Sequence, residues 1–550
     1  GSHVTTDAGT GCVHTAPAHG LDDYFICKAN NIEPIKALNN KGFFKDEYEN
    51  LAGLPAFKAD PFVIEILISS KSLINVESYE HSYPRCWRHK SPLIFTSTPQ
   101  WFISMSKAGL LDEAKSSINS VIWEPSWGLQ RIQSMLEERP DWCISRQRNW
   151  GVPITLVVHK DTGDLHPNQD NLFNIFADLI EDSGVAVWDS VKLSDYIDDA
   201  DNYTKITDTL DVWFDSGATH FSVLEKRFKK GLVADLYLEG SDQHRGWFQS
   251  SLLTSIAING RPPYKEVLTH GFVVDDKGRK QSKSLGNVVS PQKVWNSLGA
   301  DILRLWVAAT DFRSEMNASD EILKRVSDQY RRIRNTFRFL LGNLNDFDIE
   351  KNGVDLDKLI ELDKWILNST LQLQAEVQEH FKKYQYHTAV QKIHNFCVNE
   401  LGGIFLDIVK DRLYTTSTDS HARRSCQTSM YHIVSILVRL ISPILSFTAE
   451  EIWQTYSPLK KQNKSVFLSK FIDGIEFADQ QIIDEEWTKL FEIKDLVNQA
   501  IEKARNDGLV KGSLDTNVEI ICTKHTYEIL QNFGEELHFV FISSSISVIY

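Results

Sequence analysis

Two lysines three positions apart, Lys280 and Lys283, stand in the segment Gly278-Arg279-Lys280-Gln281-Ser282-Lys283-Ser284-Leu285-Gly286-Asn287. Each lysine carries a compact positive charge on a flexible stem. The small hydroxyl residues and the glycines around them favour a mobile loop. Phosphoryl and nucleotidyl transfer are catalysed mainly by positioning and by charge stabilisation. The segment therefore predicts a loop that closes on a polyphosphate, although a solvated turn would have a similar composition.

A second polar segment lies between an apolar run and a helical pattern. Glu239, Gly240, Asp242 and Gln243 come directly after Leu236-Tyr237-Leu238, which reads as a buried strand. Ligands of open α/β sheets bind outside the carboxyl ends of the strands, where a helix N-terminus offers free N–H groups. Carboxylate and amide side chains there suit ribose hydroxyls and amino groups. A capped helix with ordinary polar residues is the alternative.

Two further segments combine aromatic and charged residues. Asp211-Val212-Trp213-Phe214-Asp215-Ser216-Gly217 alternates aromatic, acidic and glycine residues, as a pocket wall requires. Trp142-Cys143-Ile144-Ser145-Arg146-Gln147-Arg148-Asn149-Trp150-Gly151 places two arginines between tryptophans. These arginines are able to face a polyanion or to pair with local carboxylates.

The elements that must position these segments follow a clear order in the 550 residues. Such a length predicts three or four domains. Residues 1–125 mix β-like runs, such as 62–68 and 93–96, with turn residues. An α/β pattern covers residues 126–317, with a strand at 266–269, a helix at 247–257 and an acidic insertion near 160–205. Residues 318–490 are strongly helical, and residues 491–550 combine a helix at 493–504 with β-rich runs.

Helix boundaries are clearest after the lysine segment. Ser290 is a good N-cap, Pro291 suits the first helical position, and Gly299 can end the helix. Asp301 is expected to cap the helix that follows.

Composition excludes several classes of protein. The net charge of −15 argues against broad, non-specific coating of nucleic acid. No apolar run approaches the roughly 20 residues of a membrane span. Seven scattered cysteines fit a reducing compartment. For the stretch around Cys86, from His81 to His89, we favour a structural role over a zinc site, and we predict no metal site.

The four segments together resemble class I aminoacyl-tRNA synthetases, most closely the isoleucyl enzymes. The motifs DVWFDSG, YLEGSDQHRGWF and WCISRQRNWG resemble the corresponding motifs of that family. The resemblance extends over essentially the whole chain. The family's lysine loop reads KMSKS, whereas this chain reads KQSKS, with Gln281 in place of methionine.

The resemblance implies activation of isoleucine by ATP with Mg²⁺ and its transfer to isoleucine tRNA. Lys280 and Lys283, with Ser282 and Ser284, would stabilise charge on the phosphates. The resemblance assigns the aminoacyl-adenylate to Glu239, Gly240, Asp242 and Gln243, and the isoleucine side chain to Trp213 and Trp247. The fold implied is the second half of a Rossmann-type catalytic domain over residues 126–317.

The same resemblance implies a partial mixed α/β editing domain with its return linker over residues 1–125. Asp23 would bind the α-ammonium group of a misattached valine, and His14 would shape the hydrolytic pocket. Ala18 stands where glycine is expected.

For residues 318–490 the resemblance implies an all-α anticodon-binding bundle, followed by a truncated C-terminal α/β junction at 491–550. Arg331, Arg334 and Arg338 fall on one helical face and would contact tRNA phosphates; a solvated face is the alternative. We also expect a monomer in the cytoplasm, with no membrane partner.

Departures from the family pattern shape the final expectation. No His-x-Gly-His motif occurs, the threonine-rich part of the editing site is missing, and so is the cysteine-paired zinc module. We therefore expect a fragment of a bacterial-type enzyme, inactive alone, with zinc possible only in the missing module. A non-catalytic tRNA-binding module and a valyl or leucyl enzyme are the alternatives.

Overall fold

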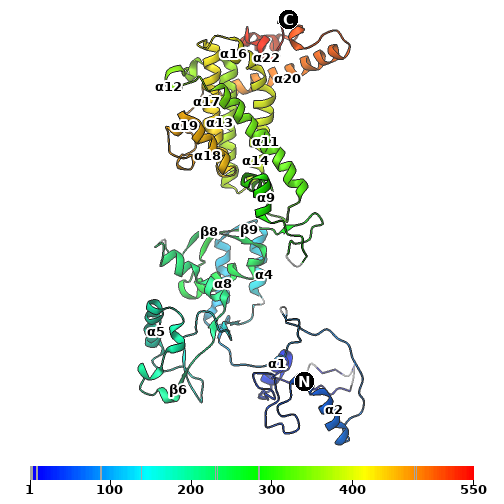
Figure 1. Ribbon diagram of the computed structural model, residues 1–550, viewed down its shortest axis with the longest axis vertical. Helices are drawn as coiled ribbons and strands as arrows, with labels where there is room; N and C mark the ends of the chain where they lie inside the picture. The colour runs from blue at the N-terminus through cyan, green and yellow to red at the C-terminus, as the bar shows by residue number, and fades with distance from the viewer. Residues whose placement is uncertain are drawn as a thin grey trace. The chain divides into compact units, whose positions relative to one another are not determined.

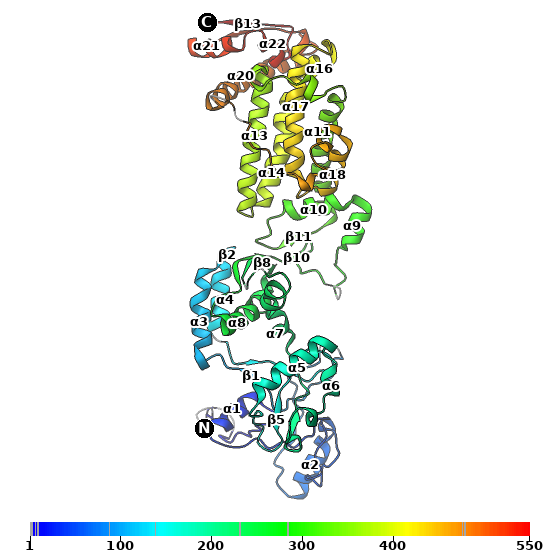
Figure 2. The same ribbon diagram turned by 90° about the vertical axis from the view of Figure 1, so that its left-hand side faces the viewer.

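The computed structural model describes the chain apart from residues 1–3, 6, 8, 9, 87, 88, 138, 230, 232, 283, 284, 476, 478 and 479, and apart from the side chains of residues 480–484. It forms two compact units. Unit 1 contains residues 1–113 and 138–219, and unit 2 contains residues 114–137 and 220–550. Figures 1 and 2 show their elements, and each unit is described by itself.

The N-terminal part of unit 1 contains two helices, α1 (Leu21–Ala29) and α2 (Asp60–Ser69). The β-like interpretation of residues 62–68 is wrong, because this run lies within α2. Pro61 stands in the first helical turn, where a missing N–H costs little. A short run that is apolar apart from Glu65 does not distinguish a strand from a helix. Residues 93–96, also predicted as β-like, form no strand.

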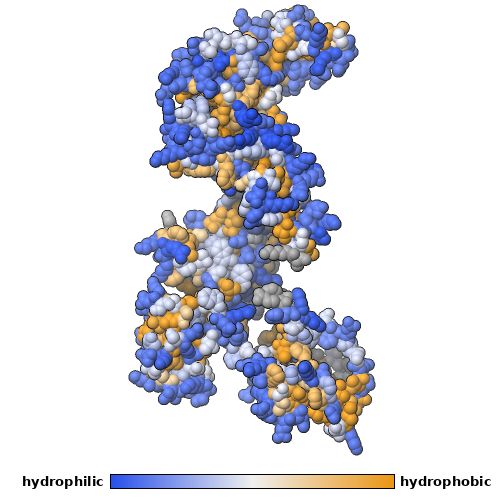
Figure 3. Space-filling view, viewed as in Figure 1, coloured by the Kyte–Doolittle hydropathy of each residue, from blue (hydrophilic) through white to orange (hydrophobic). Residues whose placement is uncertain are grey.

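Apolar side chains remain exposed on this N-terminal part. Figure 3 shows hydrophobic residues gathered over the α1 and α2 region, and Phe25, Phe57 and Ile68 are 57%, 50% and 58% exposed. Among the described residues up to Ala59, only Ala18, Cys27 and Ala59 are buried hydrophobic residues. The described residues of this part therefore do not enclose a sizeable core.

The rest of unit 1 is held by three antiparallel strand pairs: β1 (Phe102–Ile103) with β3 (Trp142–Cys143), β4 (Ser145–Arg146) with β7 (Thr209–Leu210), and β5 (Val157–His159) with β6 (Tyr203–Lys205). Helix α5 (Gln169–Ser183) lies within the predicted acidic insertion. The insertion has its own core, in which Val157, Leu172, Phe176 and Trp188 are buried.

A three-stranded parallel sheet is the centre of the α/β part of unit 2. Its order is β2 (Ile122–Glu124), β9 (Tyr264–His270) and β8 (Ala234–Gly240). Both predicted strands and the predicted helix are confirmed, the helix as α8 (Trp247–Asn259), with α4 (Trp127–Glu137) before β8 in the chain. Phe248, Leu252, Leu253 and Ile256 of α8 are buried. The register pairs Gly240 with His270 at the carboxyl ends of β8 and β9.

The chain then passes through a short parallel pair, β10 (Val273–Val274) with β11 (Met316–Asn317), and the helices α9 (Pro291–Leu298) and α10 (Ala300–Ala309). Ser290 precedes α9 as predicted, and Gly299 ends it with φ +96°. Asp301 does not cap its own helix. It lies inside the first turn of α10, and its carboxylate accepts hydrogen bonds from Phe447 and Thr448 at the start of α18 (Ser446–Thr455).

Beyond this point, the described residues from Asp320 to Asn506 contain helices and no strand. The long helices are α11 (Asp320–Asn343), α13 (Glu361–Lys382), α14 (Tyr386–Phe396), α17 (His421–Ile441) and α20 (Gln480–Asn506). Figure 2 shows α13 and α17 lying lengthwise together, and their buried residues, such as Ile366 and Leu437, belong to one core. Helix α20 continues across residue 490, so the helix predicted at 493–504 is part of a longer one.

Further hydrogen bonds join this bundle to the α/β part of unit 2. The guanidinium of Arg304 in α10 donates to the carbonyl oxygens of Pro443 and Ile444, at 2.7 and 2.9 Å. The hydroxyl of Tyr384, in the turn after α13, donates to the Glu266 carboxylate of β9 at 2.8 Å. Tyr384 has a φ of +54°, a conformation that side chains other than glycine adopt at a cost.

The C-terminal part combines helices and strands, as predicted. Strand β12 (Asn517–Ile521) pairs in parallel with β13 (Ser545–Ile549), and α21 (Lys524–Phe533) and α22 (Glu536–Phe541) connect them.

Candidate active site

The polar segment that contains Glu239, Gly240, Asp242 and Gln243, here called the acidic turn, lies at the carboxyl end of β8. Gly240 is buried, and a Cβ on it would lie 3.0 Å from the Asp242 carboxylate and 3.5 Å from the His270 ring, so a side chain there would require Asp242 to shift. Asp242 is exposed. The side-chain carbonyl of Gln243 accepts the Trp247 backbone N–H at 3.0 Å, at the start of α8. Glu239, in β8, is also exposed.

His244 stabilises this turn through a hydrogen bond to its backbone. The sequence did not predict this role. The His244 ring is fully buried between Trp123, Trp127 and Phe248. Its Nδ1 lies 3.1 Å from the Ser241 carbonyl oxygen, so the neutral ring can donate to it. Burial lowers the pKa of His244 to about 4, which keeps the ring neutral at physiological pH. An apolar residue could not fix Ser241 in this way.

The lysine loop begins close to the end of β9. The Lys280 ammonium group lies 3.6 Å from the centre of the Phe272 ring, in a cation–π contact. Phe272 comes two residues after His270, which pairs with Gly240. Lys280 thus contacts the segment that continues from the carboxyl end of β9, and that strand end is paired with the end of β8. Lys283 and Ser284 lie outside the described residues.

Gln281, the departure from the family's methionine, ties the loop to its surroundings. Its backbone N–H donates to Val273 at 3.0 Å, and its side-chain carbonyl accepts the Val289 N–H at 3.0 Å. Its side-chain amide also lies 3.5 Å from the carbonyl oxygens of Val274 and Ala318. A methionine would make none of these side-chain hydrogen bonds.

Asp275 organises the same loop. Its carboxylate accepts from the Lys277 and Arg279 backbone, from the Arg279 guanidinium at 2.8 Å and from the Asn287 amide at 2.9 Å. The Asn287 amide, together with the Arg279 N–H groups, holds the pKa of Asp275 well below its usual range. Asn287 in turn accepts the Ser282 backbone N–H at 3.0 Å. Asp275 and Asn287 are twelve residues apart in the chain, so no local sequence pattern indicated that they pair.

Trp247 and Trp213 belong to different units. The Trp247 ring stacks on Tyr237 at 4.0 Å in unit 2. In unit 1, Trp213 is 42% exposed in the short helix α7 (Val212–Gly217). Asp211 caps that helix by accepting the Trp213 N–H.

Asp211 is also the centre of a buried polar cluster in unit 1. It accepts from the Trp142 indole and from the Arg146 guanidinium, both at 3.1 Å. Burial, and then the neighbouring Asp211 charge, raise the pKa of Asp215 to about 6. Arg146, in the segment 142–151, therefore pairs with a local carboxylate, which was one of the two alternatives predicted for the arginines of that segment.

The predicted editing residues lie in the N-terminal part of unit 1. The Asp23 carboxylate, in the first turn of α1, accepts the Ala16 backbone N–H at 2.8 Å. His14 is exposed on the segment before α1. Ala18 is buried, and its carbonyl oxygen accepts the Ser97 N–H at 2.9 Å.

The three arginines of α11 that were predicted to contact tRNA differ in their partners. Arg334 makes a two-fold ion pair with Glu451 of α18, at 2.8 and 2.9 Å. Arg331 pairs with Asp328 one turn earlier. Arg338 is exposed, and no ion pair of it is found within the described chain. Ile333 and Phe337 of the same helix are buried.

The described residues contain neither a metal-binding cluster nor a membrane-spanning helix. No group of three or more histidine, cysteine or acidic residues there could hold a metal ion. No helix there is long and apolar enough to cross a membrane.

These features match one protein family, and the chain belongs to it. The family described as "tRNA synthetases class I (I, L, M and V)" matches residues 44–319. A second family, "Anticodon-binding domain of tRNA ligase", matches residues 363–520.

Within the class, the chain is similar to curated isoleucine–tRNA ligases. Those of Marinomonas sp. (strain MWYL1) and Alcanivorax borkumensis are each 52% identical, over 100% and 99% of this chain. The chain spans 58% of the length of each. A solved methionyl-tRNA synthetase of Mycobacterium tuberculosis aligns with a TM-score of 0.49 at 19% identity, over 70% of this chain and 69% of that one.

Proposed function

We propose that the protein containing this chain ligates isoleucine to isoleucine tRNA through an isoleucyl-adenylate. One observation supports the proposal: Gly240, beside the acidic turn, pairs with His270 at the end of β9, and the Lys280 ammonium group lies over Phe272, two residues after His270. We propose that the cationic and carboxylate groups face one ligand space, as adenylate formation requires. The similarity to curated isoleucine–tRNA ligases supports the choice of amino acid.

In this proposal, the isoleucine carboxylate attacks the α-phosphorus of ATP and pyrophosphate leaves. Lys280, with Lys283, stabilises the charge on the α-phosphate and the departing pyrophosphate. Ser282 and Ser284 contribute hydroxyl groups to the same loop. ATP would bring Mg²⁺ with it, which would supply part of the charge neutralisation at the phosphates. The tRNA hydroxyl then attacks the adenylate carbonyl and releases AMP.

The acidic turn is proposed to hold the adenylate. Gly240 lets the ligand approach the backbone, and Glu239 and Asp242 offer acceptors for hydroxyl and ammonium groups. Gln243 presents its amide N–H groups, because its carbonyl already accepts from Trp247. Trp213 and Trp247 are the proposed walls around the isoleucine side chain.

A hydrolytic editing function is also proposed, because an apolar pocket rejects an amino acid smaller by one methylene only modestly. Asp23 would bind the ammonium group of misattached valine, with His14 beside it. Residues 1–125 would then be part of an editing domain, 126–317 part of the catalytic domain, 318–490 the anticodon-binding domain and 491–550 a C-terminal junction. We further propose a monomer in the cytoplasm.

ATP–pyrophosphate exchange tests the proposal with isoleucine, valine and leucine as substrates. We expect isoleucine-dependent exchange from the complete gene product and none from the 550 residues alone. Lys280→Ala should lower the exchange rate about a hundredfold or more, the range seen when one charge-stabilising group is removed. Exposed Lys277→Ala is the matched control. Exchange that prefers valine or leucine would contradict the assignment.

A further inference from the structure

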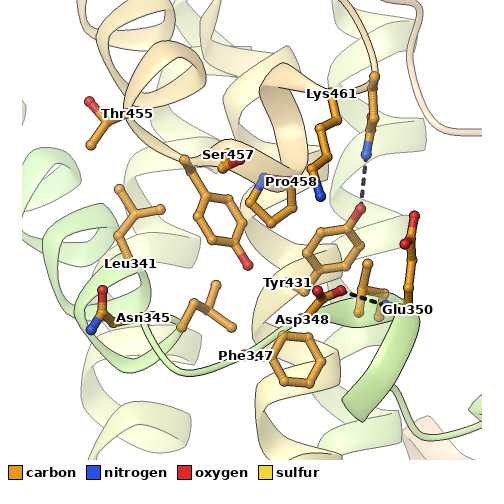
Figure 4. Close-up of a pocket in the computed structure, with 14 residues that line it drawn as sticks. Leu341, Asn345, Phe347, Asp348, Glu350, Tyr431, Thr455, Ser457, Pro458 and Lys461 are labelled. Atoms are coloured by element: carbon orange, nitrogen blue, oxygen red, sulfur yellow. Dashed lines mark hydrogen bonds between the residues drawn. The ribbon is translucent and has the colours of Figure 1, made fainter.

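A pocket in the bundle has no part in the proposed reaction. It lies where the end of α11 meets α12 (Ile349–Asn352), α17 and α19 (Ser457–Lys460), and its volume is about 560 Å³. Leu341 and Phe347, labelled in Figure 4, supply part of its apolar lining. Pockets of this size, with an apolar lining and a few polar groups, are suited to small molecules.

Tyr456 places a buried hydroxyl group in the wall of this pocket. The residue is 8% exposed, and its hydroxyl has no hydrogen-bond partner among the described residues. An unpaired buried hydroxyl destabilises a folded protein, whereas a polar atom that bonds to it removes this cost. The Tyr456 hydroxyl therefore favours a ligand with a polar group.

A chain of hydrogen bonds leaves a second hydroxyl, that of Tyr431, free to donate. The buried Arg439 donates to the Gln462 side-chain carbonyl at 2.7 Å. The Gln462 amide then donates to the Tyr431 oxygen at 2.9 Å, as Figure 4 shows. Because this oxygen accepts from Gln462, the Tyr431 O–H can donate to a ligand.

Aromatic rings line the pocket around these hydroxyl groups. The centres of the Tyr431 and Tyr456 rings lie 6.4 Å apart, and those of Phe347 and Tyr431 lie 6.5 Å apart. Aromatic rings attract one another at such separations in tilted or edge-to-face arrangements. An aromatic ring on the ligand would therefore pack well here.

Charged groups of both signs complete the pocket. Lys461 supplies an ammonium group and Glu350 a carboxylate, and no ion pair of either is found in the described part of the chain. Figure 4 shows both on the side of the pocket where Tyr431 lies. Asp348 is less available, because it accepts the Glu350 backbone N–H at 3.1 Å and pairs with Lys351. A ligand that carries one positive and one negative charge matches this arrangement.

We propose that this pocket binds a free aromatic α-amino acid as its zwitterion, of which phenylalanine is the simplest. The ligand carboxylate accepts hydrogen bonds from the Lys461 ammonium and from the Tyr431 and Tyr456 hydroxyl groups. The ligand ammonium group donates to Glu350, and the ligand ring packs against Phe347 and the two tyrosine rings. This second amino-acid site shares no residue with the proposed adenylate site, so it does not depend on isoleucine activation.

Isothermal titration calorimetry of the 550-residue chain with L-phenylalanine tests the proposal. We expect saturable binding, which Lys461→Gln and Glu350→Gln should each weaken about tenfold or more, as loss of a hydrogen bond to a charged group does. Tyr456→Phe should weaken it about three- to tenfold, as loss of a neutral hydrogen bond does. Phenylethylamine and phenylpropionate, which each lack one of the two charges, should bind about tenfold more weakly than phenylalanine.

Matched controls separate loss of the site from loss of the fold. Lys460→Gln, at the exposed neighbour of Lys461, and Tyr414→Phe, on exposed Tyr414 of α16 (Lys410–Thr415), should leave the affinity unchanged. Tyr456→Phe removes an unpaired hydroxyl, so this variant should melt at the same temperature or higher. Phenylalanine should raise the melting temperature of the unaltered chain and have less effect on Lys461→Gln.

Two results would overturn the site. One is the absence of saturable phenylalanine binding to the unaltered chain. The other is an equal affinity for phenylalanine in the unaltered chain, Lys461→Gln and Glu350→Gln. Isoleucine titrated into the same variants reports on the proposed adenylate site, because that site contains neither Lys461 nor Glu350. The two proposals can therefore fail separately.

Discussion

Asp301 of α10 caps the helix that begins beside Thr448. One carboxylate oxygen accepts both the backbone N–H and the hydroxyl of Thr448, at 2.7 and 2.6 Å, and the other accepts the Phe447 N–H at 3.2 Å. The cap and the capped helix are about 150 residues apart in sequence. One side chain thus satisfies the orphan donors of α18 and connects it to α10.

Asp301→Ala should destabilise unit 2 by about 2 kcal/mol, the upper range for loss of an N-cap, because buried donors lose their acceptor. Urea denaturation followed by tryptophan fluorescence gives the change in midpoint. Asp320→Ala, in the first turn of α11, is the matched control for effects on a helix's own dipole. Equal losses in the two variants would contradict capping of α18.

Gln281→Met should loosen the lysine loop, because the Val289 N–H loses its acceptor. A hydrogen bond contributes about 1 kcal/mol, which corresponds to about fivefold faster cleavage of the open loop. Limited trypsin digestion measures the rate of cutting after Arg279 and Lys280. Gln292→Met is the control, since its carbonyl accepts only from the Ser290 hydroxyl in the described contacts. An unchanged rate would show that the backbone contacts suffice.

Asp275 should give the lysine loop a dependence on pH. Its pKa is lowered in the folded chain, so it adds stability above the ordinary carboxyl pKa, about 4, and loses it as the pH falls further. Asp275→Asn should therefore lower the melting temperature most at pH 7, and the difference should narrow from pH 5 toward pH 3. Asp276→Asn, at the exposed neighbour, should show no such trend. A difference independent of pH would refute the role of the charge.

The arginines of α11 should separate into two roles. Arg338→Ala should weaken tRNA binding and reduce its salt dependence by about one ion, as expected for one phosphate contact. Arg334→Ala should instead lower thermal stability, because it leaves Glu451 without its ion pair. Binding titrations at several salt concentrations, with exposed Arg505→Ala as the control, distinguish them. An unchanged salt slope in Arg338→Ala would exclude the phosphate contact.

Local patterns in the sequence predicted the parts of the fold that local forces decide. The apolar run before Glu239 became β8, and the Ser290-Pro291 pair marks the start of α9. The apolar residues at 62–68 show no clear period, so their pattern alone does not identify a helix. Pro61, which suits the first turn of a helix, is the feature that favours one there.

The missed contacts at the candidate site depend on partners far apart in the chain. The acidic turn and Lys280 could be singled out from the sequence, because their residue types and, for the acidic turn, the apolar run before it are local features. His244 was not, because its role depends on burial against Trp123 and Trp127, more than a hundred positions earlier. The Asp301 cap was misassigned for the same reason, since the nearest helix start was its own.

Tyr384 restricts which sequences this fold can accept. Glycine would adopt its backbone conformation with less strain, yet only a long side chain with a terminal hydroxyl reaches Glu266. A glycine at position 384 would relax the backbone but would lose the hydrogen bond to Glu266 of β9. A residue that keeps this hydrogen bond also keeps the backbone strain. Evolutionary drift at residue 384 should therefore be slow and correlated with the residue at position 266.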